Sequence, residues 1–299
     1  MTYRKFLLPS LLILIFMGCD TLSQDGYNEY VYVESYVVAN RALPEIRIST
    51  TKPVQDIYRF SDAALTGANV QVILLDENGN DEEVFSYTSS GQPGIYVPES
   101  NTHRALPRRT YRLDIDFDSR PEVLHATTTI PDDFEILNEV PETLIYQSED
   151  RLEITISATE KTDGQNVFVF SAIALEPSLE TLTPFYRGLV DNEDAEIANF
   201  LVNSSGLINE GNFDVNPDGT ITLQFPWIGV AFYEDNFVVA NSIDKNLHDL
   251  IRSQQVQLGG GTTLSPGEIP NVIFNVDGGI GVFGSLASDT VKTYFSRPF

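Results

Sequence analysis

The clearest spacing for chemistry lies in Asp214-Val215-Asn216-Pro217-Asp218-Gly219, where oxygen-bearing side chains alternate. Oxygen atoms at alternate positions can converge on one calcium ion, as at the opening of an EF-hand loop. The twelfth position of such a loop should carry a bidentate glutamate, but here it is Phe225. A Pro-Asp-Gly turn between two strands explains the same residues. The pattern favours the turn and leaves open whether the Asp214–Asp218 loop binds calcium.

A second pattern is the G-x-G-x-x-G formed by Gly279, Gly281 and Gly284 after an expected strand. A dinucleotide site needs a helix that opens at these glycines inside a βαβ unit. Only 15 residues follow Gly284, which is too few for that unit. We therefore expect no nucleotide and no other cofactor. The glycines instead predict a strand or bulge where two backbones approach closely.

Other candidate catalytic groups are scattered along the chain. His103, His125 and His248 have neither HExxH nor any other paired spacing, so no zinc ligand set is evident. There is no G-x-S-x-G nucleophile elbow. Trp227 and the 13 tyrosines can stack on a sugar or peptide, although such aromatics more often pack within a β protein. We expect no catalytic residues, no metal site and no enzymatic activity.

A secretory signal is indicated at the N-terminal end of the sequence. Arg4 and Lys5 give a positive start, and a mainly apolar stretch follows from 7 to 17. This stretch is shorter than the roughly 20 residues that a membrane-spanning helix needs. We expect residues 1–18 to be a lipoprotein signal peptide.

Cys19 is the only cysteine of the chain, and Phe16-Met17-Gly18-Cys19 resembles the bacterial lipobox, with Phe in place of the usual Leu. That resemblance implies cleavage before Cys19 and the attachment of acyl chains such as palmitate. Stable anchoring needs about two chains, because each buried methylene contributes about 0.8 kcal/mol. We expect lipidation at Cys19, with 19–29 as lipid anchor and tether. The alternative is an ordinary cleaved signal with an incidental cysteine.

Charge limits the partners. The chain has 18 Lys and Arg against 43 Asp and Glu, which gives a formal net charge of −25. Nucleic acid is not expected as a partner, because phosphate binding needs a basic face. Adhesion of the surface to anionic lipid heads is disfavoured for the same reason.

The first part of the mature chain reads as short strands. Val31, Val33, Ser35 and Val37 alternate with polar or aromatic residues, so they are expected to face a core. Further strands are expected at 45–50, 68–75, 82–88, 94–97, 110–117 and 123–130. This spacing predicts a β-sandwich domain over 30–131.

The rest, 132–299, is expected to form a second β-rich domain. Strands are predicted at 151–158, 166–175, 220–225, 236–240, 272–276, 281–283 and 291–296. One helix is predicted near 242–257, capped by Ser242 and ended by Gly259-Gly260-Gly261. Residues 176–211 remain unassigned.

Several stretches, in order along the chain, resemble a lipoprotein family of Bacteroidota known only as a domain of unknown function, number 4249. They are Tyr32-Val33-Glu34-Ser35-Tyr36, Arg47–Pro53, Gly67–Val72, Gly94-Ile95-Tyr96, Thr110–Leu113 and Gly278–Ser285. The resemblance implies an immunoglobulin- or transthyretin-like sandwich in the N-terminal half. It also implies an association with outer-membrane TonB-dependent receptors, and it supplies no catalytic residue.

We therefore expect an accessory lipoprotein of a nutrient-uptake system, anchored in the outer membrane on a face that the sequence leaves open. Its partners would be a TonB-dependent transporter or a small-molecule, glycan or peptide ligand. The alternatives are a structural or adhesive surface lipoprotein and a secreted hydrolase, because fold alone does not decide function.

Overall fold

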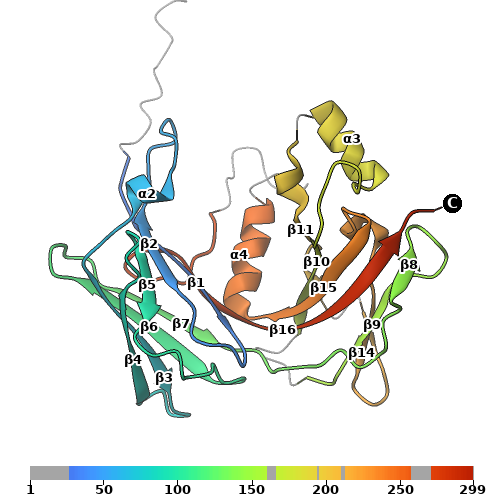
Figure 1. The fold of residues 1–299 in the computed structure, drawn as a ribbon. Coiled ribbons are helices and arrows are strands. Elements are labelled where there is room, and N and C mark those ends of the chain that lie inside the picture. Colours follow the sequence, from blue (N-terminus) through green and yellow to red (C-terminus); the bar gives the residue numbers. More distant parts are fainter. Residues whose placement is uncertain (1–26, 160–165, 194, 210–212, 257–270, 299) are drawn as a thin grey trace, which may run out of the picture.

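The structure, a computed structural model, describes residues 27–159, 166–193, 195–209, 213–256 and 271–298. It is mainly β, which confirms the predicted fold class (Figure 1). The elements before residue 131 are β1 (Val31–Val38), β2 (Ile46–Thr50), α2 (Phe60–Ala63), β3 (Ala68–Leu75), β4 (Asp81–Ser89), β5 (Ile95–Pro98), β6 (Thr110–Phe117) and β7 (Leu124–Thr129).

The later elements include three strands of five or more residues and two helices of ten or more. They are β8 (Thr143–Ile145), β9 (Glu153–Ile156), β10 (Val167–Ala174), α3 (Pro184–Glu193), η2 (Ile197–Phe200), β11 (Val202–Ser204), β12 (Ile208–Asn209), β13 (Asp214–Val215), β14 (Ile221–Gln224), η3 (Trp227–Gly229), β15 (Glu234–Ile243), α4 (Lys245–Gln255) and β16 (Ile280–Ser296).

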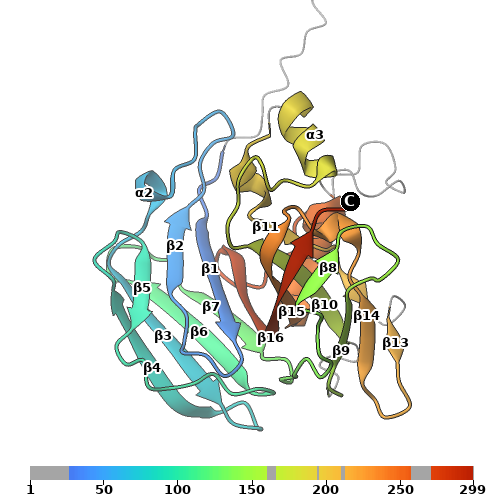
Figure 2. The same cartoon turned by 45° about the vertical axis from the view of Figure 1, so that its right-hand side comes forward.

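Most strands belong to one mixed sheet in the order β11-β10-β15-β16-β1-β2-β5-β4-β3-β6-β7, while β13-β14-β9 form a second, smaller sheet. The large sheet contains strands from both sides of the boundary expected at residue 131. It curls so that β7 returns beside the start of β16 (Figure 2). There His125 and Asp277 exchange backbone hydrogen bonds of 3.1 and 2.8 Å.

The alternation in β1 decides which of its faces is buried. Val31, Val33, Ser35 and Val37 are buried, as predicted. Their apolar members share one core cluster with side chains from β2, β3, β6 and β7. Burying a valine side chain contributes about 1.5–3 kcal/mol, so this face fixes the strand and leaves Tyr32, Glu34 and Tyr36 on the outer face.

Strand β16 joins two groups of strands in the large sheet. One group is β1 to β7, and the other is β10, β11 and β15. The first part of β16 pairs in parallel with β1, from Ile280 opposite Tyr32 to Leu286 opposite Val38. Its second part pairs antiparallel with β15, from Leu286 opposite Ile243 onwards. Leu286 is therefore the position at which β16 changes partners, and both groups of strands depend on it.

The predicted close approach of backbones at the glycine run is present in this pairing. Gly281 has φ +118°, and a Cβ added there would lie 2.0 Å from Val33 O. A Cβ at Gly279 would lie 2.7 Å from Val31 O, and one at Gly284 would meet Leu247 of α4 at 2.6 Å. The glycines thus serve the packing of β1 and α4 against β16.

Two expectations for the second half were wrong, and one unassigned stretch contains a helix. The strands predicted at 281–283 and 291–296 are one strand, because Gly284 packs against Leu247 of α4 and Ser285 hydrogen-bonds to β7 instead of forming a turn. Residues 272–276 form no strand. The unassigned stretch 176–211 contains α3, so α4 is accompanied by a second helix of ten residues.

The predicted helix cap was also wrong. Ser242 lies buried in β15, and the side chain of Asp244 caps α4 by accepting a hydrogen bond from Leu247 N at 2.9 Å. The predicted end of the helix, Gln257 with Gly259-Gly260-Gly261, lies outside the described residues.

Asp244 also belongs to a buried chain of oxygen atoms that joins α4, β7 and β16. Thr128 Oγ1 lies 2.6 Å from Asp244 Oδ2 and 2.7 Å from Ser285 Oγ, and Ser285 donates to Thr129 O at 3.0 Å. Burial raises the pKa of the Asp244 carboxyl to about 6, although the hydrogen bonds that it accepts from Thr128 and Leu247 act in the opposite direction.

Gly281→Ala should lower the free energy of unfolding by about 2–4 kcal/mol, because the new methyl group combines an unfavourable φ with overlap onto Val33. Gly91→Ala is the matched control, since Gly91 has φ +90° but open space around a Cβ. Its cost should stay near 1 kcal/mol. Equal losses for both variants in urea unfolding would contradict the close approach.

Asp244→Asn should stabilise the protein at neutral pH. The raised pKa means that the folded state binds the proton more tightly than the unfolded chain, so stability falls as the pH rises from about 4 to about 6. Asparagine keeps the cap and supplies a donor without charge, so a gain of about 1–3 kcal/mol is expected at pH 8 and little at pH 4.

Urea unfolding at both pH values measures this difference. Asp249→Asn is the control, because its neighbours lower the pKa of Asp249, so its loss should not stabilise. A destabilised Asp244→Asn at pH 8 would show that the carboxylate is needed in its charged form.

Candidate functional site

The outer face of β1 and β2 carries a cleft of about 420 Å³, called here the β1–β2 cleft. The strand alternation that buries Val31 and Val33 turns Tyr32 and Glu34 outward to this cleft. The lining residues are Tyr32, Glu34, Arg47, Thr50, Thr51, Lys52, Tyr58 and Phe60. They come from β1, β2, the loop that follows β2 and the first residue of α2.

Strand register brings the charged pair of the cleft together. Glu34 and Arg47 are direct cross-strand neighbours, with Arg47 Nη1 3.8 Å from Glu34 Oε2. The Arg47 guanidinium also lies 4.5 Å from the ring centroid of Phe60. Its Nε is buried and has no hydrogen-bond partner among the described residues. Arg47 is thus held by an ion pair and an aromatic face, with one N–H unused.

Hydrogen bonds orient two of the phenols. Tyr36 donates to Glu34 Oε1 at 3.0 Å, and the hydroxyl of Tyr58 lies 3.1 Å from Ser49 Oγ. Burial, followed by the Glu34 carboxylate, raises the pKa of Tyr36 well above its usual range. Burial also raises the pKa of Tyr32, with smaller contributions from Glu34 and Tyr58. The hydroxyl groups of Tyr32 and Tyr36 are therefore neutral at pH 7 and can form hydrogen bonds.

This composition suits the binding of a small ligand. Ligand sites are mostly apolar and aromatic, with a few convergent polar groups that fix orientation. Tyr58 and Phe60 offer ring surfaces, while Arg47 and Glu34 offer one donor group and one acceptor group. A sugar ring or a peptide side chain can lie against the rings and bond to the charged pair.

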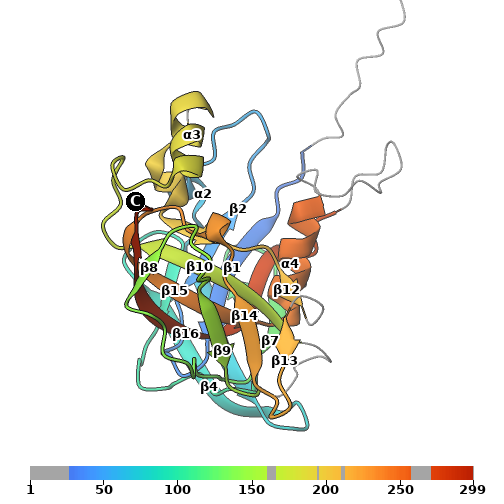
Figure 3. The ribbon, with the colours of Figure 1, turned by 90° about the vertical axis from the view of Figure 1, so that its right-hand side faces the viewer.

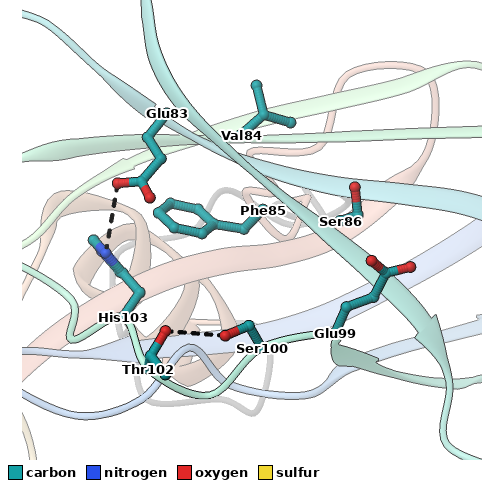
Figure 4. Close-up of a pocket in the computed structure, with 8 residues that line it drawn as sticks. All are labelled: Glu83, Val84, Phe85, Ser86, Glu99, Ser100, Thr102 and His103. Atoms are coloured by element: carbon teal, nitrogen blue, oxygen red, sulfur yellow. Dashed lines mark hydrogen bonds and ion pairs between the residues drawn. The ribbon is translucent and has the colours of Figure 1, made fainter.

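A second pocket, of about 470 Å³, lies between β4 and the segment after β5 (Figure 4). Its most reactive group is His103, whose ring stacks on Phe85 at 4.3 Å between centroids. Tyr111 accepts from Leu106 N at 3.0 Å, and its hydroxyl lies 2.9 Å from His103 Nε2. Burial lowers the pKa of His103, against the weaker opposing effect of Glu83. The His103 ring is thus engaged in a hydrogen bond with Tyr111.

The other two histidines of the sequence lie elsewhere. His125 Nδ1 is 2.8 Å from Asp114 on the sheet, and His248 Nδ1 is 3.0 Å from Asp249 on α4. Within the described residues, no three His, Cys, Asp or Glu side chains gather as a metal site. The lipidation site expected at Cys19 lies outside the described residues.

The Asp214–Asp218 segment forms the turn that the sequence favoured. Asp214 pairs with Thr222 across the β13–β14 hairpin. Asp218 Oδ1 accepts from Thr220 N at 3.0 Å and from Thr220 Oγ1 at 2.7 Å, and these bonds lower the pKa of Asp218. The carboxylate is thereby committed to the turn.

Trp227 packs, as expected, against other aromatic side chains. Its ring lies 5.5 Å from Tyr146 and 6.2 Å from Phe295, both in edge-to-face geometry. The β1–β2 cleft was not predicted as a site. Its only signal in the sequence is the row of Tyr32, Glu34 and Tyr36 on the outer face of the first strand.

Family membership follows from a match to the model of a domain of unknown function, DUF4249, over residues 20–292. The chain belongs to this family, as its ordered motifs indicated. No curated protein matches the chain.

Solved structures give only weak likenesses. An α2-macroglobulin of Escherichia coli activated by porcine elastase has 12% identity and a TM-score of 0.25, with 90% of this chain and 23% of that chain covered. A tetra-tandem repeat from the extending region of a large adhesion protein has 12% identity and a TM-score of 0.23, with 90% and 49% covered. At these TM-scores neither carries an argument about function.

Tyr58→Ala should weaken any ligand that stacks in the β1–β2 cleft by at least about tenfold, which corresponds to about 1.4 kcal/mol. Tyr58→Phe keeps the ring and should retain most of the affinity. Arrays of glycans and peptides, followed by calorimetry on the hits, measure this. Phe85→Ala in the His103 pocket is the control, and a larger loss there would move the site to that pocket.

Proposed function

We propose that this protein is a non-enzymatic accessory lipoprotein of an outer-membrane nutrient-uptake system. It binds a ligand or a TonB-dependent transporter through its folded part while Cys19 holds it on the membrane. The observation that carries the proposal is the position of the β1–β2 cleft. The cleft lies beside Tyr27 and Tyr30, at which the expected tether enters the fold.

Hydrogen bonds attach Tyr27 and Tyr30, where the chain enters the fold, to Thr51. Tyr27 donates from its hydroxyl to Thr51 O, and the backbone N–H of Thr51 donates to Tyr30 O at 2.9 Å. Thr51 also lines the cleft. An anchored molecule meets neighbours in the same membrane at high effective concentration, so weak contacts near the tether suffice for association.

The chemistry of the cleft favours binding over bond-making. Its lining contains no serine, histidine or cysteine, and its carboxylate is paired with Arg47. The histidine of the neighbouring pocket is occupied with Tyr111. The family resemblance supplies the transporter as partner, and the strong negative charge favours a protein or soluble ligand over lipid heads for the folded surface as a whole.

In-cell crosslinking of a tagged, lipidated protein should recover a TonB-dependent transporter above the level of an unrelated lipoprotein of similar abundance. Cys19→Ser is the matched variant, since it should release the protein from membranes or leave the precursor uncut, and should lose the crosslink.

Two results would contradict the proposal. Recovery of no transporter, together with normal nutrient uptake in a deletion strain, would favour a structural or adhesive role. A Cys19→Ser protein that matures and stays membrane-bound without detergent would place the anchor elsewhere.

A further inference from the structure

The segment between β2 and α2, residues 51–59, projects from the fold with its apolar side chains in solvent. Val54 is 90% exposed and Ile57 is 82% exposed, and Tyr58 is about half exposed. A turn that hydrogen-bonds Asp56 N to Pro53 O at 2.9 Å presents them together. Single exposed apolar residues are common on proteins, but here two almost fully exposed aliphatic side chains share one short loop with a half-exposed tyrosine.

This loop lies where the expected tether meets the fold. Thr51, the first residue of the loop, is hydrogen-bonded to both Tyr27 and Tyr30. A groove of about 450 Å³ between them is lined by Tyr27, Tyr30, Pro53 and Val54, among others. Tyr27 and Tyr30 are themselves about half exposed. The apolar loop and the entry of the chain therefore form one surface.

The charge of the loop differs from that of the whole chain. Residues 51–59 contain Lys52 and Arg59 against the single carboxylate of Asp56, whereas the chain as a whole has more than two acidic residues for each basic one. The loop itself therefore does not repel anionic lipid heads, unlike the folded surface as a whole. Aliphatic tips flanked by tyrosine and by Lys or Arg are typical of side chains that enter the interfacial region of a bilayer.

The length of the tether limits what the loop can reach. Eight peptide units separate Cys19 from Tyr27 and span at most about 29 Å when fully extended, at about 3.6 Å each. A lipid on Cys19 thus keeps the loop within reach of the same bilayer. The loop and α3 lie at the same end of the molecule in all three views (Figures 1, 2 and 3).

From these observations we infer that the β2–α2 loop is a second membrane contact, which inserts Val54 and Ile57 into the interfacial region beside the lipid anchor. This inference rests on the proposed lipidation of Cys19. The anchor supplies the affinity, and the loop fixes the orientation. The end with the β1–β2 cleft then faces the membrane, close to any protein embedded there.

The test uses full-length lipidated protein reconstituted in vesicles that contain phosphatidylethanolamine and phosphatidylglycerol. Acylated Cys19 has no free thiol, so Val54→Cys and Ile57→Cys each give one site for an environment-sensitive fluorophore. Val215→Cys is the matched control, because Val215 is 61% exposed on the β13–β14 hairpin, which lies at the opposite end of the molecule from the β2–α2 loop (Figure 3). Emission is recorded with and without lipids that carry a quencher near the headgroup.

Labels at 54 and 57 should show blue-shifted emission and lose fluorescence with the quencher lipid, whereas the label at 215 should do neither. Equal behaviour at all three positions would overturn the membrane contact, whether all are quenched or none. Flotation of the unlabelled protein separates the two proposals. A protein that does not float with vesicles lacks the anchor, whereas one that floats with an unquenched loop has the anchor but not the second contact.

Discussion

Strand β16 passes between two groups of strands, and its parallel pairing with β1 is the contact on which the rest of the molecule depends. The pairing requires Gly281, because no Cβ fits between its Cα and Val33 O. At Leu286 the same strand changes partner from β1 to β15. The two halves of the sequence therefore share one sheet through β16, and a side chain at Gly281 would weaken the pairing that connects them.

The pairing of β16 with β1 and β15 explains the buried polar groups around it. Asp244 follows directly after β15, caps α4, and meets Thr128 of β7 and Ser285 of β16. A buried carboxyl is costly when charged, and burial raises the pKa of Asp244 to about 6 even though the hydroxyl groups of Thr128 and Ser285 stabilise the charged form. Gly284 lets Leu247 of α4 approach β16 at the same level. Helix α4 and strands β7 and β16 are thus held together at one place in the core.

The same pairing determines what the outer surface presents. Once β1 buries Val33 against the core, Tyr32 and Glu34 must face outward, and the register with β2 brings Arg47 opposite Glu34. The β1–β2 cleft and the β2–α2 loop follow from this arrangement. Both lie at the end where the chain enters from the expected anchor. A binding surface beside an anchor is the arrangement that the proposed role in uptake at a membrane requires.

Local pattern predicted the strands of the first half well, because one buried face gives strict alternation, as in β1 and β6. It failed at β16, where Gly284, Ser285 and Ala287 are small and resemble a loop but are buried, with Gly284 against α4 and Ser285 against β7. The cleft could not be predicted, because Arg47 meets Glu34 only through strand register, and Phe60 meets Arg47 only because the chain folds back after β2. The glycine run was interpreted correctly because its context excluded a βαβ unit.

Native-state hydrogen exchange of the full-length protein tests most directly whether β16 unites the two groups of strands. If β16 unites the two groups of strands, the slowest amides of β3 and β6 and those of β10 and β15 should exchange with the same free energy and the same denaturant dependence, together with those of β16. Exchange of one group through its own lower-energy opening, while the other stays protected, would contradict this account.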